Sequence, residues 1–599
     1  MEINLLFNLI DQPWLVARPV GGGRVAEYSL RQILMEAENL EDLVVDVPTQ
    51  KPAILRQLLL PIVLHALDRV PDNRAWARLF HAGAFSPEQR KALNDYLDAC
   101  RDLFDLFHPT DPFAQVADLH TARDETKGTA LLVATEATGN NVPLFACRTE
   151  GDPLELTPAQ AARWLLHTHC WDTAAIKTGV VGDSQVKAGK TTGNPTGPLG
   201  QFGVVMPVGR TLYETILLNL PSGGVQLSDD LPQWLRRSRD GRVEETQSVA
   251  LPAWQARAAK GLLDLWTWQS RRIRLIPQET PVGIRVTRVI VAAGDRLSQT
   301  PDFEPHATWT LDPAGGTRGG RSASSRKTGK PAKQTALLPR RPRRHQPGKA
   351  AWRGLDALLA TDREDTDATT TTAGFHTSLL LDQLRTRRET MPSDFPLQVE
   401  LSGIVYGTQS AVVEDILFDA IPLPLTSLGA DSLVHAVLLE ITSQAEELAQ
   451  AVNYLSADLR RAAGADPIPW DRGQRPGDMV LHAFDPLVRR LLVGLRAVGE
   501  DVDQIERGQL AWEQVAWQRT WEIAEQVFAT APPTTFAGRI DQKKNKEGSQ
   551  EGKKAIYRMS TAEASFRRRI NQILTRAAEA RSTLKRPETK ADAVPTNVV

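Results

Sequence analysis

The sequence predicts an α+β fold: a large mixed N-terminal domain with β-hairpins and loops over residues 1–427, then a C-terminal four-helix bundle over 428–584 and a disordered tail over 585–599. Three observations support this prediction. The chain has 599 residues, too many for one hydrophobic core. Up to residue 427, short apolar runs alternate with glycine- and proline-rich turns, as is typical of small strands and hairpins. From Leu433 onwards, apolar residues recur every three or four positions, which is the period of an amphipathic helix.

The chain is expected to open with a hairpin and a capped helix. Apolar residues over 3–18, three glycines at 21–23 and the run VAEYSL predict two strands joined by a turn. Ser29 stands where it can cap a helix that begins at Leu30.

Two more helices should follow. Apolar residues at helical spacing predict a helix over 51–67, which Pro61 should kink or interrupt because proline lacks the N–H of the helical ladder. Ser86 as cap and Pro87 at the first helical position predict another helix that runs to about Leu106.

Residues 204–220 are apolar and β-branched, and strands are predicted at 271–276, 283–292 and 397–406. The alternation over 284–289 puts Arg285 and Thr287 on one face and Arg288 near the strand's turn toward Gly294. The strand at 397–406 leads into a tight turn that contains Thr408 and presents Gln409.

The predicted bundle consists of four helical stretches. They lie at 433–459, 476–497, 508–530 and 560–582. Ser560 and Glu563 have the spacing of a capping box, which predicts the start of the last stretch.

Composition excludes several classes of protein. The net charge of −1 gives no global field for nucleic acid, so any such binding must come from local segregation of charge. The three cysteines form no CxxC pair, which argues against a disulfide framework and a cysteine-rich zinc site. His167 and His169 would not share a face of a helix, so we expect no metal. No apolar run is long enough for a membrane span and the start of the chain lacks a signal peptide, so we expect a cytoplasmic protein.

A basic insert interrupts the N-terminal domain at about 314–350. Eleven lysines and arginines lie between Arg318 and Lys349, and no acidic residue lies between Asp312 and Asp356. Such a segment cannot bury enough apolar surface to order itself, so we expect a disordered cationic tether. It could be a plain linker or an arm that adds non-specific affinity for a polyanion.

A glycine loop, residues 189–203, is the most unusual stretch of the chain. It holds five glycines and two prolines in fifteen residues, a composition tolerated where the backbone turns sharply or something approaches it closely. Three interpretations stay open: a phosphate-binding P-loop, an inert solvated loop, and a contact with a polynucleotide. The P-loop pattern needs a glycine at the position of Ser184, so Gly189-Lys190-Thr191 matches it poorly.

Several segments together resemble one family, the large subunit (CasA) of the type I-E CRISPR Cascade surveillance complex. No single segment is specific, but their order and spacing are. The resemblance lies in FNLIDQPWLVA (7–17), HPTDPFAQ (108–115), GNNVPLF (139–145), the glycine loop with VGRTLYETILLNLP after it, WQSRRIRL (268–275) and LSGIVYGTQSA (401–411).

The resemblance implies a non-enzymatic subunit without a cofactor. Such a subunit would work with the other Cascade subunits, the CRISPR guide RNA, target double-stranded DNA and a helicase-nuclease effector. It would recognise a protospacer-adjacent motif and start strand separation and R-loop formation, with guide pairing reading the rest of the target.

The resemblance also implies roles for residues. It assigns motif recognition to the glycine loop at Thr191, Thr192, Gly193 and Asn194, with Arg288 as a basic finger where a relative has lysine. It makes Thr408 and Gln409 the strand-separating wedge, and Asn140, Asn141 and Phe145 the loop that inserts into the complex near the guide RNA. The alternatives are an NTP-hydrolysing enzyme, resting on Gly189-Lys190-Thr191, and a generic RNA-binding scaffold, resting on the basic insert.

Overall fold

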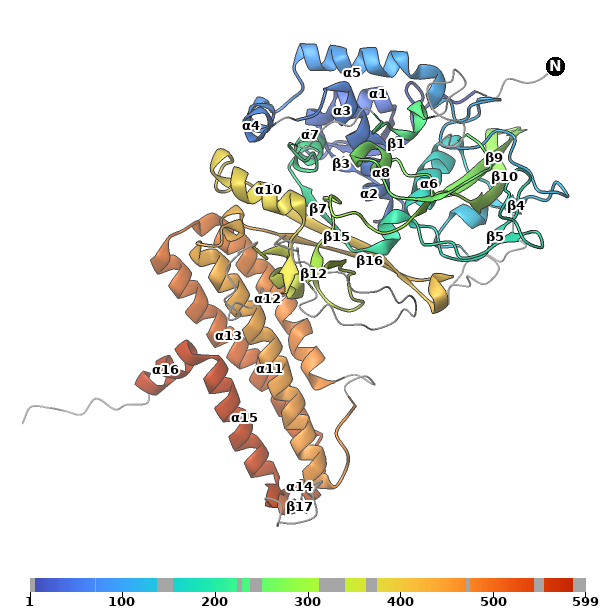
Figure 1. The fold of residues 1–599 in the computed structure, drawn as a ribbon. Coiled ribbons are helices and arrows are strands. Elements are labelled where there is room, and N and C mark those ends of the chain that lie inside the picture. Colours follow the sequence, from blue (N-terminus) through green and yellow to red (C-terminus); the bar gives the residue numbers. More distant parts are fainter. Residues whose placement is uncertain are drawn as a thin grey trace, which may run out of the picture. The chain divides into compact units, whose positions relative to one another are not determined.

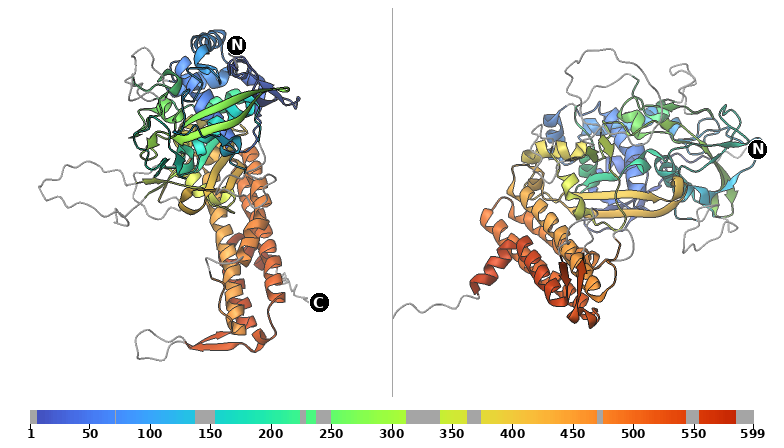
Figure 2. Two further views of the ribbon diagram at one scale, coloured as in Figure 1. Left: turned by 90° about the vertical axis from the view of Figure 1, so that its right-hand side faces the viewer. Right: turned by 60° about the horizontal axis from the view of Figure 1, so that its bottom comes forward.

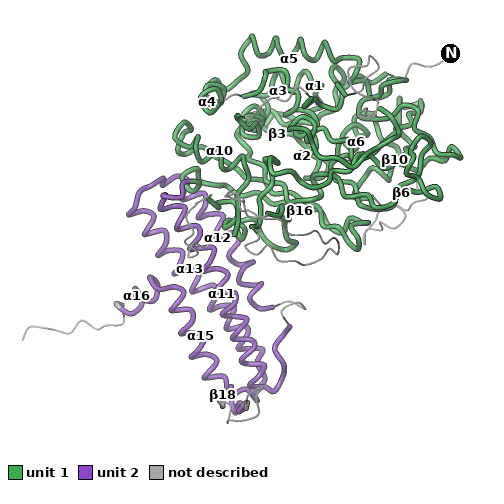
Figure 3. The backbone as a smooth tube through the Cα atoms, viewed as in Figure 1, with its two compact units in different colours: residues 1–428 green, residues 429–599 purple. Residues whose placement is uncertain are grey.

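The computed structural model describes residues 6–70, 72–136, 154–223, 229–236, 250–311, 340–361, 374–469, 475–542 and 554–584. The chain divides into two compact units, Met1–Leu428 and Gly429–Val599 (Figure 3). Unit 1 mixes helices with small sheets, whereas the elements of unit 2 are mainly helices. The mixed helix and strand content is as the sequence predicts.

Unit 1 opens with a three-stranded antiparallel sheet in the order β2-β1-β3. The strands are β1 (Leu15–Pro19), β2 (Ala26–Tyr28) and β3 (Leu40–Leu43). β1 is much shorter than predicted, because residues 9–12 form turns. Helix α1 (Leu30–Met35) begins at the predicted cap: the Ser29 hydroxyl accepts from the Gln32 N–H, and the Gln32 side chain accepts from the Ser29 N–H.

The next helix adapts to its proline. It consists of α2 (Gln50–Ile54), a π-helical turn (Leu55–Leu59) and α3 (Leu60–Ala66). Pro61 cannot donate to the carbonyl four residues before it, and the wider turn accommodates this locally. Helix α5 (Pro87–Ala99) has the predicted cap but ends before Leu106, and a 3₁₀ turn (Arg101–Phe104) follows.

Helix α6 (Pro158–Trp171) lies at the centre of unit 1. Twelve of its fourteen residues are buried. It packs against α2 and against the strands β9 and β10 (Figure 1). A helix buried on nearly every side needs such a surrounding core.

Two antiparallel sheets provide the long hairpins of unit 1 (Figure 2). One has the order β4-β10-β9, with β4 (Lys127–Gly128), β9 (Arg271–Thr280) and β10 (Gly283–Ala293). The other has the order β16-β15-β7, with β7 (Val204–Val208), β15 (Gln398–Tyr406) and β16 (Val413–Pro422). The strands predicted at 271–276, 283–292 and 397–406 are confirmed.

A fourth sheet corrects the prediction for the basic insert. Strand β12 (Trp309–Leu311) pairs with β13 (Arg340–Pro342) and β14 (Phe375–His376), and the Arg340 guanidinium stacks on the Trp309 ring at 4.7 Å. Residues 340–350 were expected to be disordered, and this is wrong: strand pairing orders 340–342, and hydrogen bonds from the Arg343 N–H to Thr308 and from the His345 ring to Val204 fix the residues that follow. The rest of the insert, up to residue 339, lies outside the described residues.

Shorter elements complete unit 1. They are α4 (Asn73–Ala82), α7 (Leu212–Leu218), α8 (Leu262–Trp266), α9 (Leu355–Leu358), α10 (Leu379–Arg387), β5 (Lys177–Thr178), β6 (Lys190–Thr191), β8 (Ala256–Arg257) and β11 (Arg296–Leu297).

In unit 2, α11 (Leu433–Ala463) packs against α12 (Pro476–Val498), α13 (Val502–Ala529) and α15 (Met559–Ile573). Helix α14 (Thr534–Ala537) and the hairpin of β17 (Arg539–Gln542) and β18 (Lys554–Tyr557) follow α13. The stretch predicted at 560–582 is broken at Leu574, after which α16 (Thr575–Leu584) begins. The predicted capping box is wrong: Ser560 and Glu563 lie inside α15, whose N-cap position is Arg558, and the Arg558 N–H donates to the Thr561 hydroxyl at 3.1 Å.

Candidate functional site

The glycine loop begins as a hairpin. β5 pairs with β6. Just before β6, Lys187 and Lys190 bond to each other across a tight turn, whose two central residues have positive φ, 49° at Ala188 and 74° at Gly189. Positive φ at both positions is the geometry of a type I′ turn. A P-loop runs from a strand directly into a helix, whereas residues 192–197, which follow Thr191, form neither helix nor strand. The geometry on which the NTP-hydrolysing alternative depends is therefore absent from this stretch.

The four predicted recognition residues of the glycine loop divide into two that shape the loop and two that face outward. The Thr191 hydroxyl is buried and donates to Asp183 at 3.1 Å. The Asn194 amide is buried and donates to the carbonyls of Ala175 and Thr191 at 3.2 and 3.0 Å. Thr192 and Gly193 are exposed, so these two residues form the accessible surface of the loop tip.

An arginine that the sequence did not single out braces this tip. Arg296 donates to the Thr192 carbonyl at 2.6 Å and to the Asn194 side-chain oxygen at 3.2 Å. Its guanidinium stacks 3.9 Å from the ring of Trp254, and the Trp254 indole N–H donates to Asp183 at 3.0 Å. Burial, and then the nearby Arg271, lower the pKa of Arg296. The guanidinium of Arg296 therefore holds the loop tip in place through these hydrogen bonds.

The later glycines of the loop are required by close packing. A Cβ at Gly197 would overlap the backbone of Cys170 and Trp171. A Cβ at Gly203 would lie 2.7 Å from the ring of His345. These positions admit no side chain without a shift of their neighbours.

The second predicted element is the turn between β15 and β16. Thr408 and Gln409 are exposed there, within a 3₁₀ turn that spans Thr408–Ser410. Gln409 has φ 57° and Ser410 has φ 54°, the left-handed region that residues other than glycine rarely adopt. The backbone therefore stores strain at the residue predicted to be the wedge.

The structure brings the glycine loop and this turn to one place. Both are hydrogen-bonded to residues 171–175, the end of α6 and the four residues after it, which we call the support segment. From the loop, the Gly197 N–H donates to the Asp172 carbonyl at 2.9 Å. From the turn, the Ser410 carbonyl accepts from the Ala174 N–H at 2.7 Å.

The support segment contains a buried charge cluster. Asp172 forms ion pairs with Lys177 at 2.6 Å and with Arg271. Burial alone would raise the pKa of Asp172, but Lys177 and Arg271 lower it to about 2. Arg271 belongs to WQSRRIRL, one of the segments on which the resemblance rests. The residue pattern of this segment did not predict that the arginine is buried.

Arg288 does not join this group. It lies within β10, paired with Gly128, and its guanidinium donates to the hydroxyl and carbonyl of Thr126. Among the described residues it has no hydrogen bond or ion pair with the glycine loop. The expected place near a turn toward Gly294 is wrong, because the tip of this hairpin lies at its other end, where Val282 is 70% exposed. A bulge beside Thr287 also breaks the predicted alternation.

The predicted assembly loop, with Asn140, Asn141 and Phe145, lies outside the described residues.

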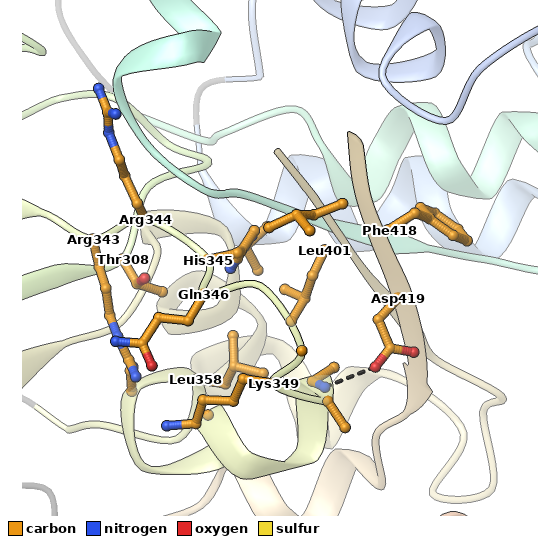
Figure 4. A pocket seen from close by; sticks show the side chains of 17 residues that line it. Thr308, Arg343, Arg344, His345, Gln346, Lys349, Leu358, Leu401, Phe418 and Asp419 are labelled. Atoms are coloured by element: carbon orange, nitrogen blue, oxygen red, sulfur yellow. Dashed lines mark hydrogen bonds between the residues drawn. The ribbon is translucent and has the colours of Figure 1, made fainter. Parts of the chain in front are cut away.

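A pocket of about 260 Å³ lies in unit 1 beside β15 and β16 (Figure 4). Its lining includes Arg343, His345, Lys349 and Leu401, and Asp419 at its edge accepts from the Ala351 N–H at 2.7 Å. None of the predicted recognition residues lines it. The His345 ring also contacts the end of the glycine loop and bonds to the Val204 carbonyl at 3.0 Å.

The described residues contain no group of three or more metal-ligating side chains and no helix long and apolar enough to cross a membrane. The two histidines of α6 have separate partners: His167 bonds to the Thr49 hydroxyl and His169 to the Ala114 carbonyl, both at 2.9 Å.

Comparison with known proteins gives one consistent answer. The family model of CRISPR-associated protein Cse1 matches residues 8–523. The CRISPR-associated protein CasA/Cse1 of Thermus thermophilus is 28% identical over 466 residues, which cover 76% of this chain and 78% of that protein. The crystal structure of Thermobifida fusca Cse1 is similar with a TM-score of 0.73 and 29% identity, over 96% of this chain and 99% of that one. A chain of a CRISPR RNA-guided surveillance complex shares the fold, with a TM-score of 0.59 and 20% identity over 88% of this chain and 99% of that one.

Proposed function

The chain belongs to the CRISPR-associated protein Cse1 family, and from this membership we propose that it is a non-catalytic subunit of a guide-RNA surveillance complex. In this proposal it recognises a protospacer-adjacent motif in double-stranded DNA, begins strand separation, and helps to recruit a helicase-nuclease in antiviral defence. A related fold occurs in a chain of such a complex.

The observation that carries the proposal is the common attachment of the glycine loop and the Gln409 turn. A motif reader and a strand separator must act at adjacent base pairs, so they need fixed relative positions. Hydrogen bonds from Gly197 and to Ser410 join the two elements to the same support segment. This arrangement supports a shared site on DNA.

The chemistry of the loop tip suits the minor groove. That groove is about 6 Å wide, so a reader there needs backbone and small side chains. Thr192 and Gly193 supply both, and the exposed Lys187 and Lys190 on the adjoining hairpin can contact phosphates. Minor-groove patterns are degenerate, so we expect several related motifs to be accepted.

The other assigned residues extend the proposal to assembly. Asn140, Asn141 and Phe145 would join the subunit to the guide RNA and the sister subunits, and the C-terminal helices would form a four-helix bundle facing the separated strands. Arg288 would contribute to DNA binding only by leaving Thr126, to which its guanidinium is bonded.

The proposal is tested with a complex reconstituted from the sister subunits and guide RNA. Gly193→Asp adds a negative charge at the exposed tip and should weaken binding to a motif-bearing duplex on the order of tenfold or more, because the charge faces phosphates. Gly223→Asp is the control outside the loop: Gly223 has a similar positive φ, 75° against 71°, and a Cβ there meets nothing within 4 Å, whereas a Cβ at Gly193 lies 3.5 Å from the Arg296 guanidinium. Equal binding by both variants would refute motif recognition by this loop.

A further inference from the structure

Side chains of the glycine loop and of β15, as well as backbone groups, form hydrogen bonds to the support segment. The Tyr406 hydroxyl, on β15 just before the Gln409 turn, donates to the Trp171 carbonyl at 2.6 Å. The Asn194 amide, at the tip of the glycine loop, donates to the Ala175 carbonyl at 3.2 Å. Each end of the support segment therefore has a bond to one of the two elements, in addition to those at Asp172 and Ala174.

One buried side chain joins the glycine loop to the support segment. Arg271, at the start of β9, is 1% exposed. Its guanidinium pairs with Asp172 and donates to the Thr173 carbonyl at 2.7 Å, both in the support segment. The same guanidinium donates to the carbonyl of Pro195 in the glycine loop at 2.9 Å. A planar group with several donors can hold two backbone segments at a fixed spacing, which a lysine ammonium cannot do equally well.

The charge cluster is not the reason that this residue must be arginine. Lys177 also pairs with Asp172, at 2.6 Å, so the carboxylate keeps a cationic partner if Arg271 is replaced. What a replacement removes is the connection between the Thr173 and Pro195 carbonyls. The special contribution of Arg271 is therefore geometric.

We infer that Arg271 is a positioning residue, and that with the support segment it sets the spacing between the motif-reading loop and the strand-separating turn. The inference rests on the proposed function, and it names the residue that would maintain the fixed relative position which this function requires. Duplex opening would begin at one fixed distance from the motif, because the two elements are fastened to the same five residues. If the bonds between the loop and the support segment were weakened, opening could begin at other distances from the motif.

The test varies the DNA as well as the protein. R-loop formation is measured for the reconstituted complex on a duplex with the native spacing and on one with a single base pair inserted between motif and target. The parent complex should strongly prefer the native spacing. Arg271→Met should reduce the ratio of the two rates on the order of tenfold, the equivalent of losing one charge-assisted hydrogen bond. Arg271→Lys should recover part of the ratio.

A neighbouring arginine provides the control. Arg272 is equally buried, but its hydrogen bonds go to Leu251, Ala253, Gln269 and Asp295, none of which belongs to the loop, the turn or the support segment. Arg272→Met should slow both substrates alike and leave the ratio unchanged. If Arg271→Met fails to fold, Tyr406→Phe removes one hydrogen bond to the support segment without any change of charge, and should lower the ratio in the same direction.

The outcomes separate the inference from the proposed function. If the parent complex shows no dependence on the motif, the proposed function fails, and the inference fails with it. If the parent depends on the motif and on spacing but both Arg271→Met and Tyr406→Phe keep the full ratio, only the positioning role is wrong. A reduced ratio in these variants, with Arg272→Met unchanged, supports it.

Discussion

Replacing Gln409 with glycine should move stability and function in opposite directions. The residue has φ 57° and ψ 20°, a conformation that costs a residue with a Cβ about 1–2 kcal/mol and costs glycine almost nothing. Glycine in turn loses about 0.4–1 kcal/mol through the greater freedom of the unfolded chain. The variant should therefore be between zero and about 1.5 kcal/mol more stable than the parent.

The functional effect should be a loss. If the Gln409 side chain takes the place of an opened base pair, it offsets part of an unstacking cost of a few kcal/mol. Losing an offset of about 1.4–2.8 kcal/mol would slow opening about 10–100-fold. The slowing should be confined to paired DNA, because a target already mismatched next to the motif has no stacking left to break.

Two measurements decide this prediction. Thermal unfolding of the subunit gives the change in stability, and R-loop rates on paired and pre-mismatched duplexes give the change in function. Gln409→Asn is the control for strain, since asparagine tolerates left-handed backbone and keeps a shorter amide. An equal defect on both duplexes, or a stability loss greater than about 1 kcal/mol, would show that the side chain has a structural role instead.

Three further predictions concern the rest of unit 1. Gly197→Ala should lower the free energy of unfolding by about 1–3 kcal/mol, because its Cβ meets backbone. Gly189→Asn is the control and should be neutral in the same denaturation assay. Similar free energies of unfolding for the two variants would show that the loop relaxes freely. Burial lowers the pKa of His169 to about 4 from 6.5, so the unfolded chain binds a proton in this window that the folded chain excludes, and stability falls as pH drops. His169→Gln keeps a donor for the same carbonyl and should flatten that fall by up to about 1.4 kcal/mol per pH unit, as measured by unfolding between pH 6.5 and 4; an unchanged slope contradicts the assignment. His345→Ala should lower the free energy of unfolding by about 1–3 kcal/mol, because its ring packs against the glycine loop. Deletion of 317–339 should leave the melting temperature within about 1 °C. A larger loss of stability in the deletion than in His345→Ala would contradict the packing described.

Local patterns in the sequence were sufficient for much of this fold. The strands of the two long hairpins have β-branched or alternating residues, and Ser29 and Ser86 fixed two helix starts through their caps. The mixed strand and helix content followed from the same signals. Ser560 misled for a related reason: its spacing to Glu563 matches a cap, but the helix had already begun at Met559.

The features that local patterns missed depend on partners far along the chain. Arg296 bonds to residues about a hundred positions earlier, and Arg271 connects segments 76 and 98 positions away. Nothing in the neighbouring sequence records such contacts. The hairpin at Ala188 was also missed, because alanine is an unusual residue at a left-handed turn position.

The type I′ turn at the start of the glycine loop also has a practical consequence for chemical labelling. Ala188 and Gly189 are exposed, and a side chain at Gly189 would meet nothing within 4 Å. The next strand leads directly to Thr191 and the loop tip. A photo-crosslinking or fluorescent amino acid placed at 188 would thus stand beside the proposed DNA contact without entering the packed part of the loop. Its reaction with one DNA strand or the other would map the orientation of the bound duplex.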